Sequence, residues 1–187
     1  AYHDKLDELY TALCFTGYRP RTLSERQLAA GDFGKTRVLF AAGAANVSDA
    51  ALKGLKKFAA QGGRIIADAE SFRENEFGNP VSPAFAVERL GKPDAASLTS
   101  QIVRSVNPLP AGIRVKHESG NQGVFFRMVP AGDGSWLVNL INYNAEPRQV
   151  ELTGNGEWFD LIREEKSETA FQLPPVRSRL LRFTPKK

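Results

Sequence analysis

The chain has 187 residues, of which 42% are hydrophobic and 25% charged, as in globular proteins of one domain or two small ones. The formal net charge of +4 is small and the basic residues are scattered, so we expect no nucleic-acid partner. No apolar run reaches the roughly 18 residues of a membrane span and no signal peptide is recognisable, so we expect a soluble protein, cytoplasmic or exported with a signal outside this chain.

The chain begins with a predicted helix followed by a predicted buried strand. Residues 4–16, "DKLDELYTALCFT", carry leucines and aromatic residues at helical spacing. A capped turn at "TLSERQL" follows. Residues 36–43, "TRVLFAAG", form a nearly continuous apolar run, which is typical of a strand buried in a parallel sheet.

A second helix and strand follow with short connections. Ser48 is a candidate N-cap for the helix 49–61, which ends before two glycines, and residues 64–68 form the next apolar strand. Helices alternating with strands predict a parallel sheet covered by helices, and we assign residues 1–106 to an α/β domain of this kind. Because the first helix has no strand before it, we expect this domain to be incomplete, with its first strand missing.

The pattern changes after about residue 105, where the linker-like sequence "NPLPAG" follows at residues 107–112. Short alternating segments, such as "SWLVNLINY" and "SRLLRFT", are separated by turn residues, and "AGDGSW" contains an Asp-Gly hairpin turn. This pattern predicts a small antiparallel β-sandwich over residues 107–187.

Acidic residues cluster directly after the strand 64–68. The candidate loop residues are Asp68, Glu70, Glu74, Glu76 and Asn79. Ligands of α/β proteins usually bind at the carboxyl ends of strands. However, the two carboxylates of a glycosidase flank the scissile bond and usually come from separate strands, whereas these follow a single strand. We therefore predict a polar, self-paired loop at an interface or cleft, with no catalytic residue.

Other kinds of site find little support in the sequence. Cys14 lies inside a predicted helix and not on the sharp turn that exposes a nucleophile, and the residues after strand 36–43 include no serine or cysteine before Ser48. The same stretch lacks the glycine-rich loop of a nucleotide site. His3 and His117 are too few and too far apart for a local metal motif, so we expect no metal and no cofactor.

Two tryptophans are candidates for stacking on a sugar ring. Trp136 and Trp158 both lie in alternating segments of the β-rich half. A place in the hydrophobic core is the usual role of a tryptophan in such a strand, and a sugar platform is the alternative.

Taken together, these segments resemble the non-catalytic middle and C-terminal regions of family 42 β-galactosidases and their relatives. The resemblance rests on the strand 36–42, "VSD", "FAAQGGRIIAD" and "ENEFGNP", and further along on "WLVNLINYNAEPRQVEL", "WFDLIREE" and "FQLPPVRSRLLRF". It implies a trimerisation domain with a flavodoxin-like fold of the class I glutamine amidotransferase type, without catalytic residues, followed by a small β domain. The acid and the nucleophile of that family lie in a (β/α) barrel, so none is carried over to this chain.

The resemblance implies an accessory region of a bacterial glycoside hydrolase that serves domain packing or oligomerisation. Its expected partners are the catalytic barrel of the parent chain, further copies of the chain and carbohydrate. Two alternatives remain: a carbohydrate-binding module that uses Trp136 or Trp158, and a degenerate amidotransferase-like enzyme that uses Asp68, Glu70 or Glu76.

Overall fold

The computed structural model describes residues 2–18, 20–90, 98, 101–102, 114–117 and 123–186, with the backbone alone for 2 and 114–117. The chain divides into two compact units. We call them the α/β unit, Ala1–Leu9 with Arg21–Pro93, and the β unit, Tyr10–Pro20 with Asp94–Lys187. The predicted boundary between residues 106 and 107 lies outside the described residues.

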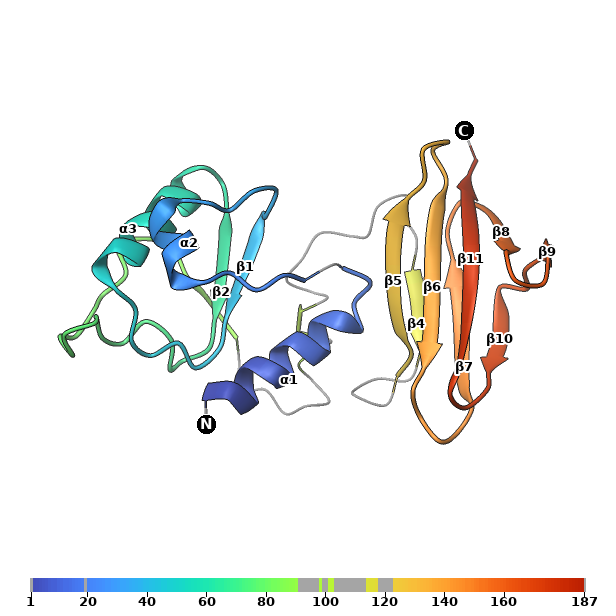
Figure 1. Ribbon diagram of the computed structural model, residues 1–187, viewed down its shortest axis with the longest axis horizontal. Helices are drawn as coiled ribbons and strands as arrows, with labels where there is room; N and C mark the ends of the chain where they lie inside the picture. Colours follow the sequence, from blue (N-terminus) through green and yellow to red (C-terminus); the bar gives the residue numbers. More distant parts are fainter. Residues whose placement is uncertain are drawn as a thin grey trace. The chain divides into compact units, whose positions relative to one another are not determined.

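The α/β unit contains a small parallel sheet with helices beside it (Figure 1). Its elements in chain order are α1 (Tyr2–Cys14), which ends in the β unit, α2 (Glu25–Ala30), β1 (Val38–Ala41), α3 (Asp49–Ala60), β2 (Arg64–Ala67) and β3 (Glu88–Arg89). The strands pair in the order β1-β2-β3, both pairs being parallel. The predicted alternation of helices and parallel strands is confirmed. Among the described strands, β1 lies at one edge of this sheet.

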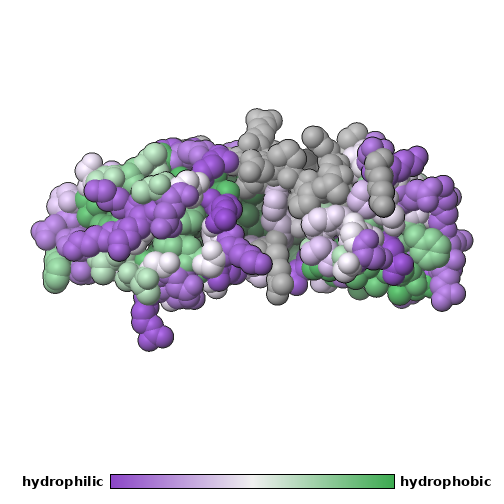
Figure 2. Space-filling model, turned by 90° about the horizontal axis from the view of Figure 1, so that it is seen from above, coloured by the Kyte–Doolittle hydropathy of each residue, from purple (hydrophilic) through white to green (hydrophobic). Residues whose placement is uncertain are grey.

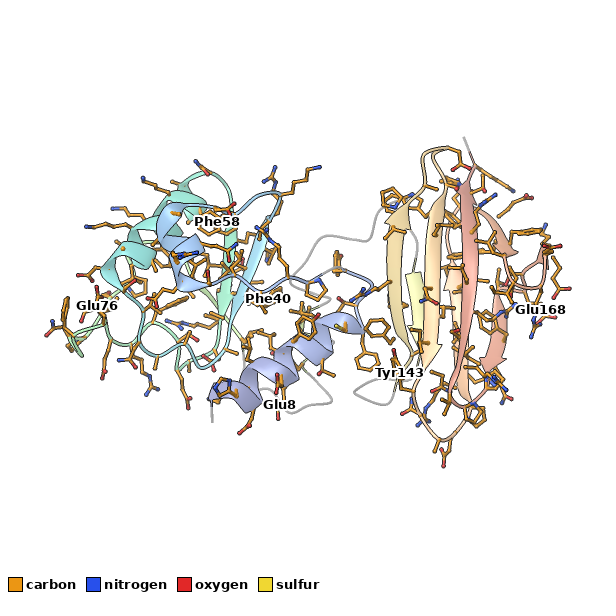
Figure 3. The ribbon with its side chains drawn as sticks, viewed as in Figure 1. Glu8, Phe40, Phe58, Glu76, Tyr143 and Glu168 are labelled. Carbon is orange, nitrogen blue, oxygen red and sulfur yellow. The ribbon has the colours of Figure 1, made fainter. Side chains whose placement is uncertain are left out.

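Helix α3 packs against the sheet with its apolar side. Leu55 and Phe58 are buried in one hydrophobic cluster with Ile65 of β2, and Figure 3 shows Phe58 on the side of α3 that faces the strands. Gly54 lies inside the helix because α2 comes very close. A Cβ atom at this position would lie 1.8 Å from the Leu28 carbonyl oxygen, so only glycine allows the contact.

The β unit contains two antiparallel sheets. Its strands are β4 (Arg114–His117), β5 (Phe125–Pro130), β6 (Trp136–Asn142), β7 (Arg148–Thr153), β8 (Gly156–Asp160), β9 (Glu165–Lys166), β10 (Ala170–Leu173) and β11 (Arg177–Pro185). One sheet has the order β10-β7-β4 and the other β5-β6-β11-β8-β9. The predicted hairpin at "AGDGSW" is confirmed, because β5 and β6 pair antiparallel on either side of it.

The two sheets share one hydrophobic core. Leu140 and Phe183 come from the five-stranded sheet, whereas Val150 and Leu173 come from the three-stranded sheet, and all four side chains are almost fully buried in the same cluster. Buried residues alternate with more exposed ones along these strands, because successive residues of a strand point to opposite faces. No helix in the described part of the chain is long and apolar enough to cross a membrane.

Candidate functional site

The predicted acidic loop begins where β2 ends, beside the end of β1. Since β1 and β2 are parallel and in register at Ala41 and Ala67, the loops that follow them leave the sheet at the same edge. Asp68 joins these two loops. Its Oδ2 accepts a hydrogen bond from the Gly43 amide at 3.0 Å, and its Oδ1 accepts bonds from the Ser71 hydroxyl at 2.7 Å and the Ser71 amide at 2.9 Å.

The Asp68 carboxylate is held in its ionised form. The Asp68 side chain is only 11% exposed, and this burial raises its pKa, but the hydrogen bonds from Ser71 and Gly43 and the charge of Lys5 together lower the pKa below its usual value. The Lys5 ammonium lies 3.7 Å from Asp68 Oδ2 and forms its closer ion pair with Glu70. A carboxylate with a lowered pKa is a poor general acid, and its hydrogen bonds make it a structural link.

Glu74 and Glu76 face the segment that starts α3. Glu74 Oε2 accepts a hydrogen bond from the Asn46 side-chain amide at 3.2 Å. Glu76 Oε2 accepts one from the Asp49 amide, at the first residue of α3, at 2.7 Å. A carboxylate at a helix N-terminus satisfies a backbone donor that has no partner within the helix and interacts favourably with the helix dipole. Figure 3 shows Glu76 in the outlying loop of the unit.

Asn75 organises the turn that carries the remaining predicted residue, Asn79. The Asn75 side chain is 8% exposed, its Oδ1 accepts hydrogen bonds from the amides of Phe77 and Asn79, both at 3.0 Å, and its Nδ2 donates to Asp49 Oδ1 at 3.3 Å. From the sequence, Asn75 was expected only to be one of the polar residues of a self-paired loop. The available signal was an asparagine four residues before another in a turn-forming sequence, since asparagine side chains bond to nearby backbone amides.

Phe72 fixes the middle of the same loop. Its φ angle is 63°, which is unusual for a bulky residue, while its ring is buried in the hydrophobic cluster and its amide donates to the Ala44 carbonyl at 2.8 Å. The loop is therefore anchored by a buried ring as well as by its polar side chains.

The structure thus brings all five predicted loop residues into one hydrogen-bonded loop system. Each of the four carboxylates contacts a backbone amide, a side-chain amide or the Lys5 ammonium. In the described part of the chain, no group of three or more histidine, cysteine or acidic residues could hold a metal ion. Cys14 is buried, and this burial raises the pKa of its thiol, which favours the unreactive protonated form.

The two candidate sugar-stacking residues differ in their surroundings. Trp158 is 3% exposed and its ring centroid lies 4.7 Å from that of Phe183, inside the core of the β unit. Trp136 is half-buried and packs against the edge of the same core. Because a sugar platform needs an accessible ring face, Trp136 is the better placed of the two.

Comparison with solved structures gives extensive matches to one group of enzymes. An apo exo-carrageenase GH42 from Bacteroides ovatus matches with a TM-score of 0.76 at 17% identity, over 98% of this chain and 27% of that one. A catalytic mutant of a GH42 β-galactosidase from G. stearothermophilus matches with a TM-score of 0.70 at 14% identity, over 97% and 36% of the two chains. A β-galactosidase from Bacillus circulans sp. alkalophilus matches with a TM-score of 0.68 at 15% identity, over 98% and 38%.

The chain has the fold of one region of these glycosidases. It spans between about a quarter and two fifths of the length of those chains, with shares of 27% to 38%. No family model and no curated protein matches the sequence. At these identities the likeness concerns the fold, in agreement with the resemblance found in the sequence.

Proposed function

We propose that this chain is a non-catalytic accessory region of a GH42-like glycoside hydrolase, which serves domain packing or oligomerisation beside the catalytic barrel of its parent chain. One observation carries the proposal. Nearly the whole chain, 97% to 98%, matches these glycosidases, whereas the match leaves more than half of each of their chains uncovered. The parent protein is then a bacterial glycoside hydrolase whose chemistry takes place outside the residues described above.

Within this proposal, each unit has an assigned counterpart. The α/β unit is the amidotransferase-like, flavodoxin-like trimerisation domain, which the parallel order β1-β2-β3 with its helices supports. The β unit is the small C-terminal β-sandwich, which the core shared by its two sheets supports. We keep residues 1–106 and 107–187 as the two domains of the proposal, with Tyr10–Pro20 as a segment of the first domain that belongs to the β unit in the structure.

The acidic loop has a scaffolding role in this proposal. A catalytic carboxylate pair needs room for a substrate between its members. In contrast, Asp68, Glu74 and Glu76 accept hydrogen bonds from the loop after β1 and from the start of α3. These bonds make the loop a rigid edge of the α/β unit that can be presented to another domain or subunit.

An activity assay tests the proposal. The purified chain is incubated with aryl β-galactosides and, to test the amidotransferase-like alternative, with glutamine. We expect no turnover of either substrate. Turnover that disappears in Glu76→Gln or Cys14→Ala would overturn the proposal. Residual turnover that persists in both variants would indicate a contaminating enzyme, with the chain itself inactive.

The half-buried Trp136 favours carbohydrate binding as a second candidate function. Titration with galacto-oligosaccharides measures it directly, with Trp136→Ala as the variant and a thermal melt of the same variant as the control. Saturable binding that is lost in a stably folded Trp136→Ala would support a binding module. If the wild type binds no sugar and Trp136→Ala fails to fold, the Trp136 ring serves as part of the hydrophobic core.

A further inference from the structure

Phe77 is an exposed aromatic residue on a turn that is closed by several hydrogen bonds. Phe77 is 76% exposed, which is the highest value among the exposed large hydrophobic residues in the described part of the chain. The backbone around it is fixed by the Asn75 side chain, which accepts from the Phe77 amide, and by the Asn75 amide, which donates to the Asn79 carbonyl at 2.9 Å. A turn that is ordered in advance loses little conformational freedom on binding, and aromatic anchors contribute most to interfaces.

The residues beside Phe77 give the turn a negative charge. Glu74 and Glu76 are both exposed, and their hydrogen bonds come from the neutral Asn46 side chain and the Asp49 amide, so no cation in those bonds cancels their charge. A complementary surface would therefore offer an apolar recess for the ring and a cation beside it.

The β unit contains a recess with these two properties. A cavity of about 240 Å³ is lined by Gly17, Tyr18, Arg127, Met128 and Val129. It is smaller than the about 300–1,000 Å³ of small-molecule sites, so it suits a single side chain better than an oligosaccharide. Arg127 is exposed and lies on β5, and its neighbour Val129 is 41% exposed.

The sheet surface beside the cavity extends this apolar and basic character. In the outward row of the five-stranded sheet, Val129 pairs with Leu137, Leu137 with Arg182 and Arg182 with Phe159. Phe159 is 40% exposed, and Arg182 is exposed. Figure 2 shows hydrophobic residues at the surface of both units, among hydrophilic ones. The row therefore provides apolar area and, on β11, a second cation, Arg182, which is separated from β5 by β6 and whose charge also acts on Asp133.

We propose that the Phe77 turn of one copy of the chain docks into the cavity beside β5 of a second copy. Phe77 fills the cavity, and Glu74 and Glu76 face Arg127 and Arg182. This inference rests on the proposed scaffold function and names the surfaces through which it acts. Because the two surfaces differ, the contact is head-to-tail, and repetition gives either a closed ring or an open chain of subunits.

Sedimentation velocity over a wide range of protein concentration tests the docking. The wild type is expected to associate in a concentration-dependent way. Phe77→Ala removes the anchor, and Arg127→Glu places a negative charge at the cavity. Each is expected to raise the dissociation constant of self-association at least about thirtyfold, as truncation of a central anchor does. Circular dichroism melts verify that both variants remain folded, and Arg127→Gln serves as the milder variant should Arg127→Glu unfold.

Mixing the two variants distinguishes head-to-tail docking from the alternatives. Phe77→Ala keeps an intact cavity and Arg127→Glu keeps an intact turn, so an equimolar mixture is expected to form a dimer that grows no further. Val176→Ala, which changes a 71% exposed residue in the turn before β11, and Arg163→Glu are matched controls and are expected to associate like the wild type.

Three results would overturn the inference: a wild type that stays monomeric, association that survives Phe77→Ala unchanged, or a mixture that stays monomeric. The last result points to a symmetric contact or to docking within one chain. Each of these leaves the scaffold proposal standing, because that proposal fails only through the activity assay.

Discussion

Each unit contains a buried aspartate at the end of a strand, and the two aspartates are satisfied in different ways. Asp68 follows β2 and bonds to Ser71 and Gly43, with Lys5 nearby at the surface. Asp160 ends β8. Its Oδ1 accepts bonds from the Ile162 and Arg163 amides, both at 3.0 Å, and its Oδ2 accepts from Arg179 Nε at 2.7 Å.

The difference lies in where the counter-charge is placed. The Asp160 and Arg179 side chains are 1% and 11% exposed, and the Arg179 guanidinium lies 4.0 Å from the centroid of the Phe171 ring. The pair is therefore sealed in the β unit, whereas the Lys5 side chain is 38% exposed. The β unit uses a charged pair as part of its core, and the α/β unit uses a carboxylate to fasten loops at its surface.

Removing the buried carboxylate of the β unit should have the largest effect. Asp160→Ala leaves the Arg179 guanidinium buried without its partner, and breaking a buried pair in this way costs about 3–5 kcal/mol. Urea denaturation followed by circular dichroism measures the loss in the free energy of unfolding.

Two further variants control this measurement. Arg163→Ala removes an exposed ion pair with Glu165, at 3.6 Å, and is expected to cost at most about 1 kcal/mol. The double variant Asp160→Ala, Arg179→Met removes both charges and should recover part of the loss. If Asp160→Ala proves as stable as Arg163→Ala, the buried pair contributes no more to the free energy of unfolding than an exposed pair does.

The equivalent change in the α/β unit should have a smaller effect. Asp68→Asn keeps the shape but places an amide donor against either the Gly43 amide or the Ser71 donors. An unsatisfied buried donor and the lost charged hydrogen bonds together cost about 1–3 kcal/mol. Denaturation under the same conditions gives the comparison. Asp133→Asn is the matched control, because the Asp133 carboxylate also accepts a hydrogen bond from a serine hydroxyl but lies in an exposed hairpin. A loss equal to that of Asp160→Ala would remove the distinction between the two aspartates.

The sequence predicted most elements of both units because their signals are local. The cap at Ser48 and the two glycines after residue 61 bracket helix α3, which runs over Asp49–Ala60. Strand β3 was missed because Glu88 and Arg89 are both exposed and carry no apolar pattern, and the strand forms by pairing with β2. Helix α2 was predicted only as a capped turn, because six residues give too short a periodic pattern.

The site was predictable in position but not in partners. Asp68 follows an apolar strand, so its place at the edge of the sheet could be inferred from the sequence. Its bond to Gly43 joins residues 25 positions apart, and the ion pair of Glu70 with Lys5 joins residues 65 positions apart, so neither has a local signal. The exposure of Phe77 could not be predicted either, since a phenylalanine in a turn sequence gives no local signal of whether its ring is buried.

Acid titration should sharpen the comparison further. Hydrogen bonds and nearby cations lower the pKa of both Asp68 and Asp160, although burial acts against this shift. A carboxylate with a lowered folded pKa contributes stability that is fully present above the unfolded value, about 3.9, and is lost as the pH falls through the folded pKa. Between neutral pH and about pH 2, Asp68→Asn and Asp160→Asn should each reduce the acid-induced loss of stability relative to the wild type. If the free energy of unfolding of both variants falls with pH as steeply as that of the wild type, other carboxylates cause the acid sensitivity.

The smallest effect is expected from the surface pair that completes the Asp68 site. The Lys5 and Glu70 side chains are 38% and 54% exposed, and solvent and salt screen such pairs. Lys5→Met should therefore lower the melting temperature less than Asp68→Asn does, and the difference from the wild type should shrink as salt is added. Lys166→Met, which removes an exposed pair with Glu157 at 3.7 Å, is the matched control. If Lys5→Met instead destabilises the chain as much as Asp68→Asn, the Lys5 charge and not the bonds from Ser71 and Gly43 holds Asp68 ionised. The α/β unit would then depend on a charged pair in the same way as the β unit.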